Sequence, residues 1–314
     1  MTYLVLFICL WIALLFYFRI ADHYNIIDHP NERSSHADIT IRGGGILFPL
    51  VNLLIIVLYP AYWLPALGGL LIGTISFIDD RITLSNKIRI VIHIVSVTLM
   101  FIFLDVFKLP FYQFIVLYII AIGVINVYNF MDGINGITGC YTLIVLAGLQ
   151  YVNLYGVKFI NPDLIWFPML ACIVFLFYNF RKQAKCFAGD VGSITIAFWI
   201  VFLLFQLIFI NHNWSYILFL AVYGVDSVLT IAHRLILKQN IFKAHRLHFY
   251  QLLANEHKVS HLVIAAGYAL IQLLVIAFIV LNTRFSQFEA FMVVLLPLML
   301  VYLIFKPRLM KVLR

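Results

Sequence analysis

The acids, amides, histidines and arginines of this largely apolar sequence gather in a few short segments, and one segment has a helical spacing. Asn126, Asn129 and Asp132 recur at every third position at the end of an apolar run, and Gly133 follows them. Residues three apart are neighbours on a helix surface, so these side chains would gather at one helix end. Polar groups at the end of a membrane helix are costly unless they bind a ligand or one another. The segment therefore predicts a binding site for a polar ligand.

An aspartate pair, Asp79 and Asp80, ends another apolar run. Adjacent carboxylates repel each other unless a cation lies nearby. Because Mg²⁺ binds one or two carboxylates together with phosphate oxygens, a magnesium site is one interpretation. An ordinary acidic helix end paired with Arg81 is the other, and the pair alone does not decide between them. Lys87, farther along, either holds a phosphate or anchors the chain at the membrane surface.

Asp190 lies in the segment Gly189-Asp190-Val191-Gly192-Ser193, at the start of a long apolar run. An aspartate at this position is typical of a helix N-cap. The same geometry places a carboxylate beside free backbone amides, where it is suited to bind a metal ion. We favour the second interpretation because the other polar segments accompany it.

Two further segments have the chemistry of anion binding. Arg33 and His36 lie in the first polar loop, and His245, Arg246 and His248 lie in the longest one. Imidazole and guanidinium groups within one turn can clamp a phosphate, and arginine makes the planar two-point contact. An ordinary polar loop would also carry such residues, so the histidines alone do not establish the function.

The elements that must position these residues are membrane helices. Of the 314 residues, 64% are hydrophobic and 11% are charged, whereas a soluble domain is about half apolar and about a quarter charged. Helices satisfy every backbone amide inside the lipid, so we predict an all-α polytopic membrane protein in which 1–314 form a single domain. The eleven predicted spans are 3–20, 43–59, 63–78, 88–104, 113–130, 136–155, 164–180, 191–210, 216–235, 261–281 and 289–305.

The basic residues predict the orientation of these spans. Of the 21 Lys and Arg, only Lys108, Lys158 and Arg284 fall on one side, and the other 18 fall on the opposite side. Positive residues mark the cytoplasmic side, which gives a periplasmic N-terminus and a cytoplasmic C-terminus. All five polar segments then lie on the cytoplasmic face. Asp226, inside the ninth span, is interpreted either as an ion site or as half of a structural pair with a basic neighbour.

A site of this composition suits phosphoryl transfer, which needs positioning, a divalent ion and cationic clamps. The alternative is a polytopic transporter with an ion site on the cytoplasmic side. Transporters place their sites near the midplane between repeated halves, whereas these clusters lie at one interface and no repeat is evident. A CDP-alcohol phosphotransferase is not indicated, because its D-G-x-x-A-R signature is missing.

The order of the segments resembles that of the polyprenyl-phosphate N-acetylhexosamine-1-phosphate transferases, the MraY and WecA superfamily. The motifs D-x-P-N-x-R-x-x-H with GG, then DD, N-x-x-N-x-x-DG-x-x-G, GD-x-GS and H-R-x-H follow the family order over essentially the whole chain. The last motif, His245-Arg246-Leu247-His248-Phe249-Tyr250-Gln251, is more similar to the WbpL-type branch that starts O-antigen chains. It departs from the histidine-rich string of the peptidoglycan enzyme.

The resemblance implies that a sugar 1-phosphate passes from a UDP-N-acetyl-hexosamine to undecaprenyl phosphate, releasing UMP and starting a cell-envelope polysaccharide such as O-antigen. It implies Mg²⁺ as cofactor, with Mn²⁺ as an alternative, and the two substrates and the bilayer as partners, without nucleic acid. The active site would face the cytoplasm from the bacterial inner membrane. The sugar (GlcNAc, FucNAc, QuiNAc or GalNAc) and the oligomeric state, a homodimer included, stay open.

The motifs and the chemistry of the residues together give a predicted site. Asp79, Asp80 and Asp132 are the expected catalytic residues, and Asp190 and Asn129 are the expected metal ligands. The expected substrate-binding residues are Arg33, His36, Lys87, Asn126, Asn129, His245, Arg246 and His248. Asn135 stands where many bacterial members have a second aspartate, so any carboxylate role there falls to Asp132.

Overall fold

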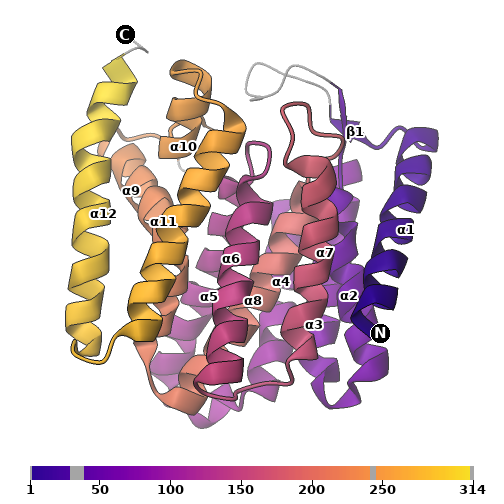
Figure 1. Cartoon of the computed structure of the whole chain (residues 1–314), viewed down its shortest axis with the longest axis horizontal. Coiled ribbons are helices and arrows are strands. Elements are labelled where there is room, and N and C mark those ends of the chain that lie inside the picture. The colour runs from indigo at the N-terminus through magenta and orange to yellow at the C-terminus, as the bar shows by residue number, and fades with distance from the viewer. Residues whose placement is uncertain (1, 29–38, 241–244, 312–314) are drawn as a thin grey trace.

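The long apolar runs fold as helices that extend side by side between the two ends of the molecule (Figure 1). The computed structural model describes residues 2–28, 39–240 and 245–311. The long helices within these ranges are α1 (Thr2–His23), α2 (Leu47–Leu58), α3 (Trp63–Arg81), α4 (Asn86–Phe103), α5 (Phe111–Met131), α6 (Ile137–Tyr155), α7 (Asp163–Asn179), α8 (Gly189–Asn211), α9 (Ala221–Ile236), α11 (His261–Leu281) and α12 (Gln287–Met310). A short helix, α10 (Phe249–Gln251), lies between α9 and α11.

Each of the eleven predicted spans corresponds to one of these helices, but their lengths differ. Within the described ranges, nine helical segments are long and apolar enough to cross a membrane, whereas Gly44–Leu58 and Asp163–Asn179 are shorter. At about 1.5 Å per residue these two reach roughly 22–26 Å, less than the roughly 30 Å of a hydrocarbon core. The all-α class is therefore confirmed, and the prediction of eleven full-length spans is corrected to nine.

Local sequence explains where several helices begin. Ser85 precedes α4, and its hydroxyl accepts a hydrogen bond from the Ile88 amide. Ser286 and Glu289 form a reciprocal capping box at the start of α12. Such caps satisfy amides that have no partner in the first helical turn. They fix the ends of helices whose bodies are too uniformly apolar to have a distinct boundary.

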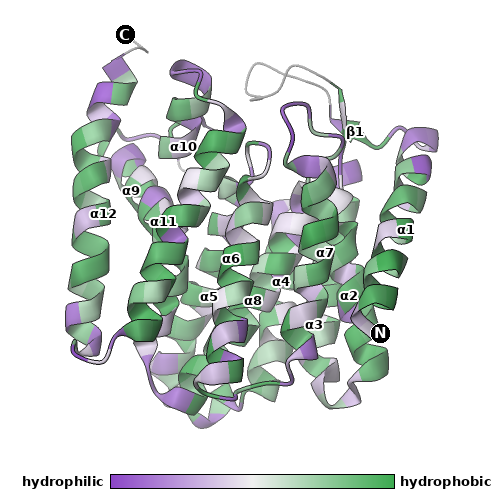
Figure 2. Cartoon of the chain, viewed as in Figure 1, coloured by the Kyte–Doolittle hydropathy of each residue, from purple (hydrophilic) through white to green (hydrophobic). Residues whose placement is uncertain are grey.

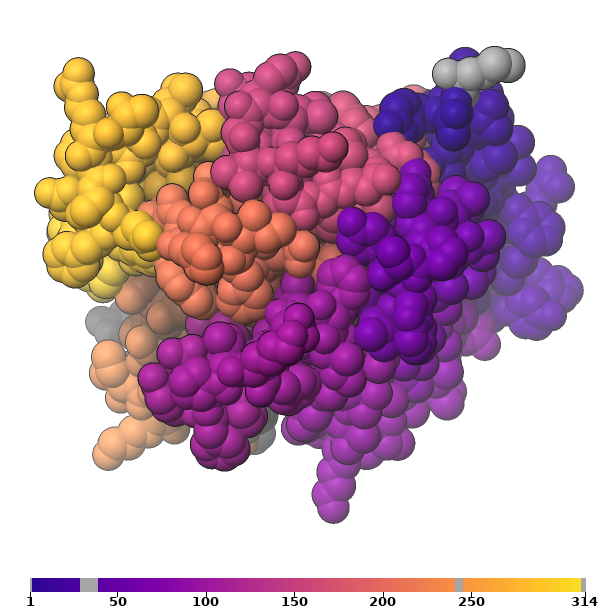
Figure 3. Space-filling view, turned by 90° about the horizontal axis from the view of Figure 1, so that it is seen from below, coloured from indigo at the N-terminus to yellow at the C-terminus, as the bar shows by residue number. Residues whose placement is uncertain are grey.

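Helix α8 occupies the middle of the bundle. Nearly every residue from Val191 to Ile208 is buried, and α3 and α5 pack along it. By contrast, α12 buries only four residues and lies at the edge of the bundle (Figure 1). Hydrophobic residues form a broad band across the molecule, and hydrophilic segments collect at its ends (Figure 2). From below, the N-terminal and C-terminal segments lie on opposite flanks (Figure 3).

A small backbone junction joins the segment before α2 to the segment before α8. Strand β1 (Ile27–Asp28) pairs antiparallel with β2 (Thr40–Ile41), and Ile41 bridges to Cys186. The Gly44 amide donates to the Phe187 carbonyl at 2.8 Å. A methyl group on Gly45 would lie 2.2 Å from a backbone carbon of α8, so only glycine permits this approach. The junction brings together residues about 145 positions apart in the sequence.

Candidate functional site

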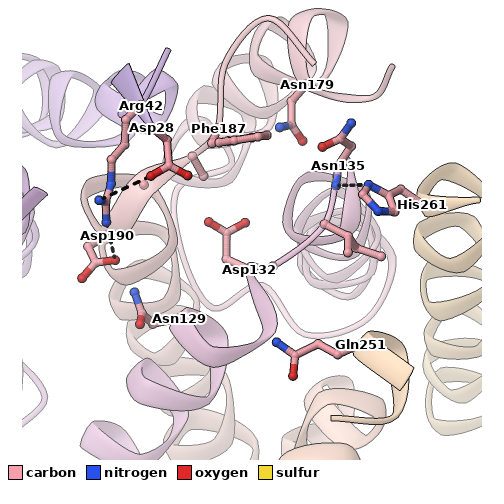
Figure 4. Close-up of a pocket in the computed structure, with 14 residues that line it drawn as sticks. Asp28, Arg42, Asn129, Asp132, Asn135, Asn179, Phe187, Asp190, Gln251 and His261 are labelled. Atoms are coloured by element: carbon pink, nitrogen blue, oxygen red, sulfur yellow. Dashed lines mark hydrogen bonds and ion pairs between the residues drawn. The ribbon is translucent and has the colours of Figure 1, made fainter. Parts of the chain in front are cut away.

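A polar cavity of about 220 Å³ opens at the end of the bundle that carries α10 and β1 (Figures 1 and 4). Asn129, Asp132 and Asp190, three residues of the predicted site, line it. They come from the end of α5, the turn that follows it, and the first turn of α8. The other side chains that line the cavity and contribute polar groups are Asp28, Arg42, Asn135, Asn179, Gln251 and His261.

The carboxylate of Asp80 ties three segments together beside this cavity. Its two oxygens accept hydrogen bonds from the backbone amides of Asp190 (3.2 Å) and Val191 (3.1 Å). Arg42 lies 2.8 Å from the same carboxylate, whose side chain is only 1% exposed. A buried carboxylate is stable when it is paired and fully hydrogen-bonded. Asp80 therefore fixes the N-terminal turn of α8, and with it the position of Asp190.

Arg42 also faces the carboxylates of the cavity. Its guanidinium lies 3.8 Å from Asp190 and 3.9 Å from Asp28 (Figure 4). The hydroxyl of Tyr17 donates a hydrogen bond to the Arg42 carbonyl at 2.7 Å, which holds this residue against α1. With a side chain 35% exposed, Arg42 combines a fixed backbone with a guanidinium that can reach an incoming anion.

Asp79 has different partners from those of Asp80. It accepts a hydrogen bond from the Leu84 amide at 2.7 Å and pairs with Arg89 at 3.3 Å. Arg89 in turn lies 3.7 Å from Asp190. The two arginines therefore supply the positive charge that the aspartate pair requires. Among the described residues, neither Asp79 nor Asp80 lines the cavity.

The turn after α5 is held rigidly around Asp132. The Asn179 side chain accepts a hydrogen bond from the Gly136 amide (2.7 Å), and the Asn135 amide group donates to two carbonyls of the 180–183 loop, at 2.9 and 3.1 Å. The carboxylate of Asp132 points into the cavity (Figure 4). Burial raises the pKa of Asp132 to about 7, and the charge of Asp190 adds to the rise. Asp132 can therefore exchange a proton near neutral pH.

The two asparagines of α5 have different surroundings. Asn129 donates a hydrogen bond to the Ser193 hydroxyl at 3.2 Å and is one of the residues that line the cavity. Asn126 donates to the Ile122 carbonyl of its own helix at 2.8 Å. Asn126 does not line the cavity in the described part of the chain. The helical spacing thus brings one of the two asparagines into the site.

Asp226 anchors the segment that carries the histidines. This buried carboxylate accepts hydrogen bonds from the Phe249 amide (2.9 Å) and the Tyr268 hydroxyl (2.7 Å), and it lies 3.4 Å from His248. His248 is 2% exposed and caps α10. Of the two interpretations of Asp226, the structural pair therefore applies, with a histidine as the basic neighbour. His248 is placed as an anchor rather than as a lining residue.

The remaining predicted substrate-binding residues lie around the cavity or beyond it. His245 and Arg246 are half-buried near His248, outside the cavity lining. Burial, together with the nearby basic groups, lowers the pKa of His245 to about 3, so its imidazole is neutral at pH 7. Lys87 is exposed at the start of α4. Arg33 and His36 lie outside the described residues.

The donor set fits a magnesium ion that completes its shell with water and phosphate. Within the described ranges, no group of three or more His, Cys, Asp or Glu residues is arranged to hold a metal ion. Mg²⁺ usually takes only one or two protein carboxylates and shares substrate phosphates. Asp190 and the Asn129 carbonyl line one cavity and could supply such ligands.

Several lining residues were not singled out by their sequence pattern. Arg42 and Asn179 carry no distinctive spacing, although Asn179 is an amide at the end of an apolar run, and buried polar groups there usually serve a function. Asp28 opens the D-x-P-N-x-R-x-x-H motif but carried no predicted role of its own. Gln251 is the last residue of α10, and His261 is the first residue of α11. Arg42 directly precedes three glycines, and this was the one local signal of close backbone approach at that point.

Comparison with known proteins finds a matching family model and several similar proteins. The model of the family described as glycosyl transferase family 4 matches residues 62–208. A probable undecaprenyl-phosphate N-acetylglucosaminyl 1-phosphate transferase of Bacillus subtilis is 28% identical over 78% of this chain and 75% of its own length. The Escherichia coli K12 undecaprenyl-phosphate alpha-N-acetylglucosaminyl 1-phosphate transferase is 25% identical, over 60% of this chain and 57% of its own.

A third relative has a different named activity. The phospho-N-acetylmuramoyl-pentapeptide-transferase of Petrotoga mobilis is 30% identical over 49% of this chain and 56% of its own length. The matched family region contains Asp79, Asp80, Asn129, Asp132 and Asp190, but ends before α9 and α10. The family match therefore includes Asn129, Asp132 and Asp190, and leaves the histidine segment and the lining residues Asp28, Arg42, Gln251 and His261 outside.

Proposed function

We infer that this chain is a member of glycosyl transferase family 4, and we propose that it transfers an N-acetylhexosamine 1-phosphate from a UDP-sugar to undecaprenyl phosphate. The observation that carries the proposal is the cavity where Asn129, Asp132 and Asp190 meet beside Arg42. The names of the two N-acetylglucosaminyl transferases support UDP-GlcNAc as the first donor to test.

The proposed reaction exchanges one phosphorus–oxygen bond for another. An oxygen of the lipid phosphate attacks the phosphorus that carries the sugar, and the bond from that phosphorus to UMP breaks. UMP leaves, and the product is a lipid diphosphate sugar. Because a phosphate monoester has its second pKa near 6, the attacking oxygen is largely ionised at pH 7. The protein therefore has to position two anions rather than create a strong nucleophile.

In this scheme each polar side chain of the site has its own role. Arg42 contacts a phosphate oxygen of the donor, because its guanidinium is the partly exposed cation of the cavity. Asp132 accepts a proton from the fraction of acceptor that is still protonated, since its raised pKa of about 7 matches that task. His245 and Arg246 bind phosphate at the cavity edge, with His245 acting as a neutral hydrogen-bond partner.

Asp190 and Asn129 would hold Mg²⁺ in this scheme. Bound there, the ion would neutralise the diphosphate and stabilise the charge that develops on the leaving phosphate. Asp80 acts one step removed, because it holds the first turn of α8 through the amides of Asp190 and Val191. The acceptor is a lipid, so we further propose that this end of the bundle faces the cytoplasm, where the water-soluble donor is available.

The proposal is tested with the purified full-length chain in nanodiscs. Undecaprenyl phosphate, MgCl₂ and one UDP-sugar at a time, chosen from GlcNAc, FucNAc, QuiNAc and GalNAc, are supplied, and UMP and the lipid-linked sugar are measured by mass spectrometry. We expect equal amounts of the two products with at least one donor. Asp132→Asn should abolish both products. Asp105→Asn, an exposed position with a left-handed backbone at the far end of α4, should leave the activity unchanged.

If none of the donors gave the two products, the proposal would be contradicted. If the same preparation in sealed vesicles then carried a labelled solute across the membrane, the transporter alternative would replace it. Release of UMP without a lipid-linked sugar would indicate hydrolysis of the donor and would contradict the assignment of the acceptor.

A further inference from the structure

A second cavity lies at the edge of the bundle, between α9 and α12. It has a volume of about 550 Å³ and is lined by residues of the last two turns of α9 and by residues near the end of α12. Its apolar lining residues are Leu229, Ala232, Ile236, Leu303, Pro307 and Met310. Ile236 and Leu303 are 78% and 56% exposed, so the groove opens toward the surroundings of the bundle. In a membrane these surroundings are lipid.

This groove has a basic lining. His233, Lys306 and Lys311 contribute to it, and no carboxylate does among the described residues. Lys306 is only 3% exposed. Its ammonium group donates hydrogen bonds to the hydroxyls of Thr230 (3.0 Å) and Tyr302, both of which are neutral partners. Lys311, just past the end of α12, is exposed at the rim.

The polar end of the groove has unused hydrogen-bonding capacity. The Nδ1 atom of His233 is buried and has no hydrogen-bond partner within the described ranges. The nearest acid along the hydrogen-bond chain is Asp226, which Lys306 reaches only through the Thr230 hydroxyl (3.2 Å). A buried ammonium without a contacting anion is unfavourable in a membrane protein. A ligand with an anionic group at this position would satisfy both Lys306 and His233.

We propose that the groove between α9 and α12 binds one anionic phospholipid. Its headgroup phosphate lies against Lys306 and His233 with Lys311 at the rim, and an acyl chain lies along the apolar residues of the two helices. Two features of the groove fit such a lipid. The lysines at one end suit the headgroup phosphate, and the apolar residues, which are open to the bilayer, suit the acyl chain. Juxtamembrane basic residues attract anionic lipids in the same way.

This lipid would be distinct from the acceptor substrate. Helix α9 packs against α5 on one side and against α12 on the other. The cavity with Asp132 lies on the α5 side, and the Asp226 network stands between it and Lys306. A phosphate at Lys306 would therefore not reach the reacting groups, and we assign the groove to a lipid that is bound and not consumed.

The groove is nevertheless linked to the first cavity by a chain of contacts. The Thr230 hydroxyl donates a hydrogen bond to Asp226. The same carboxylate accepts hydrogen bonds from the amides of Phe249 and Tyr250 at the start of α10. The Tyr250 hydroxyl donates to the Phe130 carbonyl at 2.9 Å, two residues before Asp132. Occupation of the groove should thus stabilise the α10 segment as well as α12.

The test uses the full-length protein in nanodiscs of phosphatidylcholine, with or without phosphatidylglycerol. We expect phosphatidylglycerol to raise the Tm, and native mass spectrometry to retain one phosphatidylglycerol per chain. Lys306→Gln should weaken this binding roughly tenfold, the loss of one charge-assisted contact. Leu303→Trp should weaken it by filling the groove with its charges intact. Arg19→Gln, an exposed basic residue of α1 on the opposite flank, is the matched control and should bind as the wild type does.

Two results would overturn the proposal. If Lys306→Gln lowered the Tm equally with and without phosphatidylglycerol, and Leu303→Trp left the retained lipid unchanged, Lys306 would have a purely structural role. If undecaprenyl phosphate displaced phosphatidylglycerol and Lys306→Gln raised the KM for that acceptor, the groove would belong to the substrate. Because the Tm and the retained lipid are measured without turnover, the test stands apart from the proposed transferase activity.

Discussion

The guanidinium of Arg42 lies 2.8 Å from the buried carboxylate of Asp80, although the two residues belong to segments on either side of α2. The same carboxylate accepts both of the first amides of α8 that follow Gly189. One ion pair thus connects the loop before α2, the end of α3 and the start of α8. The geometry around Asp190 depends on this connection.

Asp80→Asn should therefore reduce activity without preventing membrane insertion. The asparagine side chain offers one acceptor where the carboxylate offers two, so its NH₂ group would face a backbone N–H or the Arg42 guanidinium. We expect kcat to fall about 10–100-fold, the usual effect of losing a group that orients a metal ligand. The kcat and the membrane-integrated fraction are measured in parallel. Wild-type turnover in this variant would contradict the positioning role.

Asp190→Asn should act on the metal requirement. The substitution keeps the volume of the side chain but removes the charge that Mg²⁺ needs. The Mg²⁺ concentration for half-maximal activity should rise about 10–100-fold, with little change in Tm, because the amides of this turn remain bonded to Asp80. Asp22→Asn, an exposed acid on α1, is the control. An unaltered Mg²⁺ titration for Asp190→Asn would exclude it as a ligand.

Gly189→Ala should damage the site through its backbone. Gly189 has φ +71°, and an added Cβ would lie 2.6 Å from an Asp80 carboxylate oxygen. Both the left-handed backbone and this contact disfavour a side chain. We expect a lower Tm and a loss of activity. Gly267→Ala, within α11, has nothing within 4 Å of its new methyl group and should be neutral or stabilising by up to about 1 kcal/mol. Equal behaviour of the two variants would refute this explanation.

The raised pKa of Asp132 predicts a pH-dependent stability. A carboxyl whose pKa is about 7 in the folded protein, against 3.8 ordinarily, binds more protons folded than unfolded. Stability is therefore lost as pH rises from about 4 to about 7, and it levels off above that range. Asp132→Asn removes this loss. In Mg²⁺-free buffer, the Tm advantage of the variant over the wild type should be larger at pH 8 than at pH 5. A constant difference between the two proteins would show that the pKa of Asp132 is not raised.

Asn135→Asp should destabilise the protein and should not raise its activity. The Asn135 amide donates to the carbonyls of Arg181 and Lys182, so a carboxylate there would face two acceptors at about 3 Å. The loss of two buried hydrogen bonds and the repulsion should cost on the order of 3 kcal/mol. A fall in Tm at pH 8 that is partly reversed at pH 5, where the acid can be neutralised, would confirm the cause. Asn135→Asp with an unchanged Tm would contradict it.

The sequence predicted those features that depend on local pattern. Hydrophobic runs located all eleven long helices of the described ranges, because length and apolarity are properties of contiguous residues. Asn129 and Asp132 were placed in one site because helical spacing relates them, and Asp190 because it begins an apolar run after Gly189. The length of α2 was overestimated, because turn residues next to it are also apolar, whereas α7 has the predicted length of 17 residues.

The features that escaped prediction depend on packing between distant segments. The pairing of Arg42 with Asp80 requires that the loop before α2 be held against the segment before α8, and no spacing within either segment reveals this. Asp226 is similar: its partner His248 follows 22 positions later and is brought close by the docking of α10. The amide at position 135 likewise has its reason in the carbonyls of a separate loop.

The central position of α8 has a consequence for biosynthesis. The ribosome completes the sequences of α1 to α7 before the Asp190 turn exists, so Asp80 is made before the two backbone amides that bond to its carboxylate. Until α8 packs against α3 and α5, the Asp80 carboxylate lacks these two hydrogen-bond donors. Nascent chains that stop short of α8 should therefore be substrates for membrane quality control, whereas chains that extend past it acquire the assembled cavity and become resistant to proteolysis.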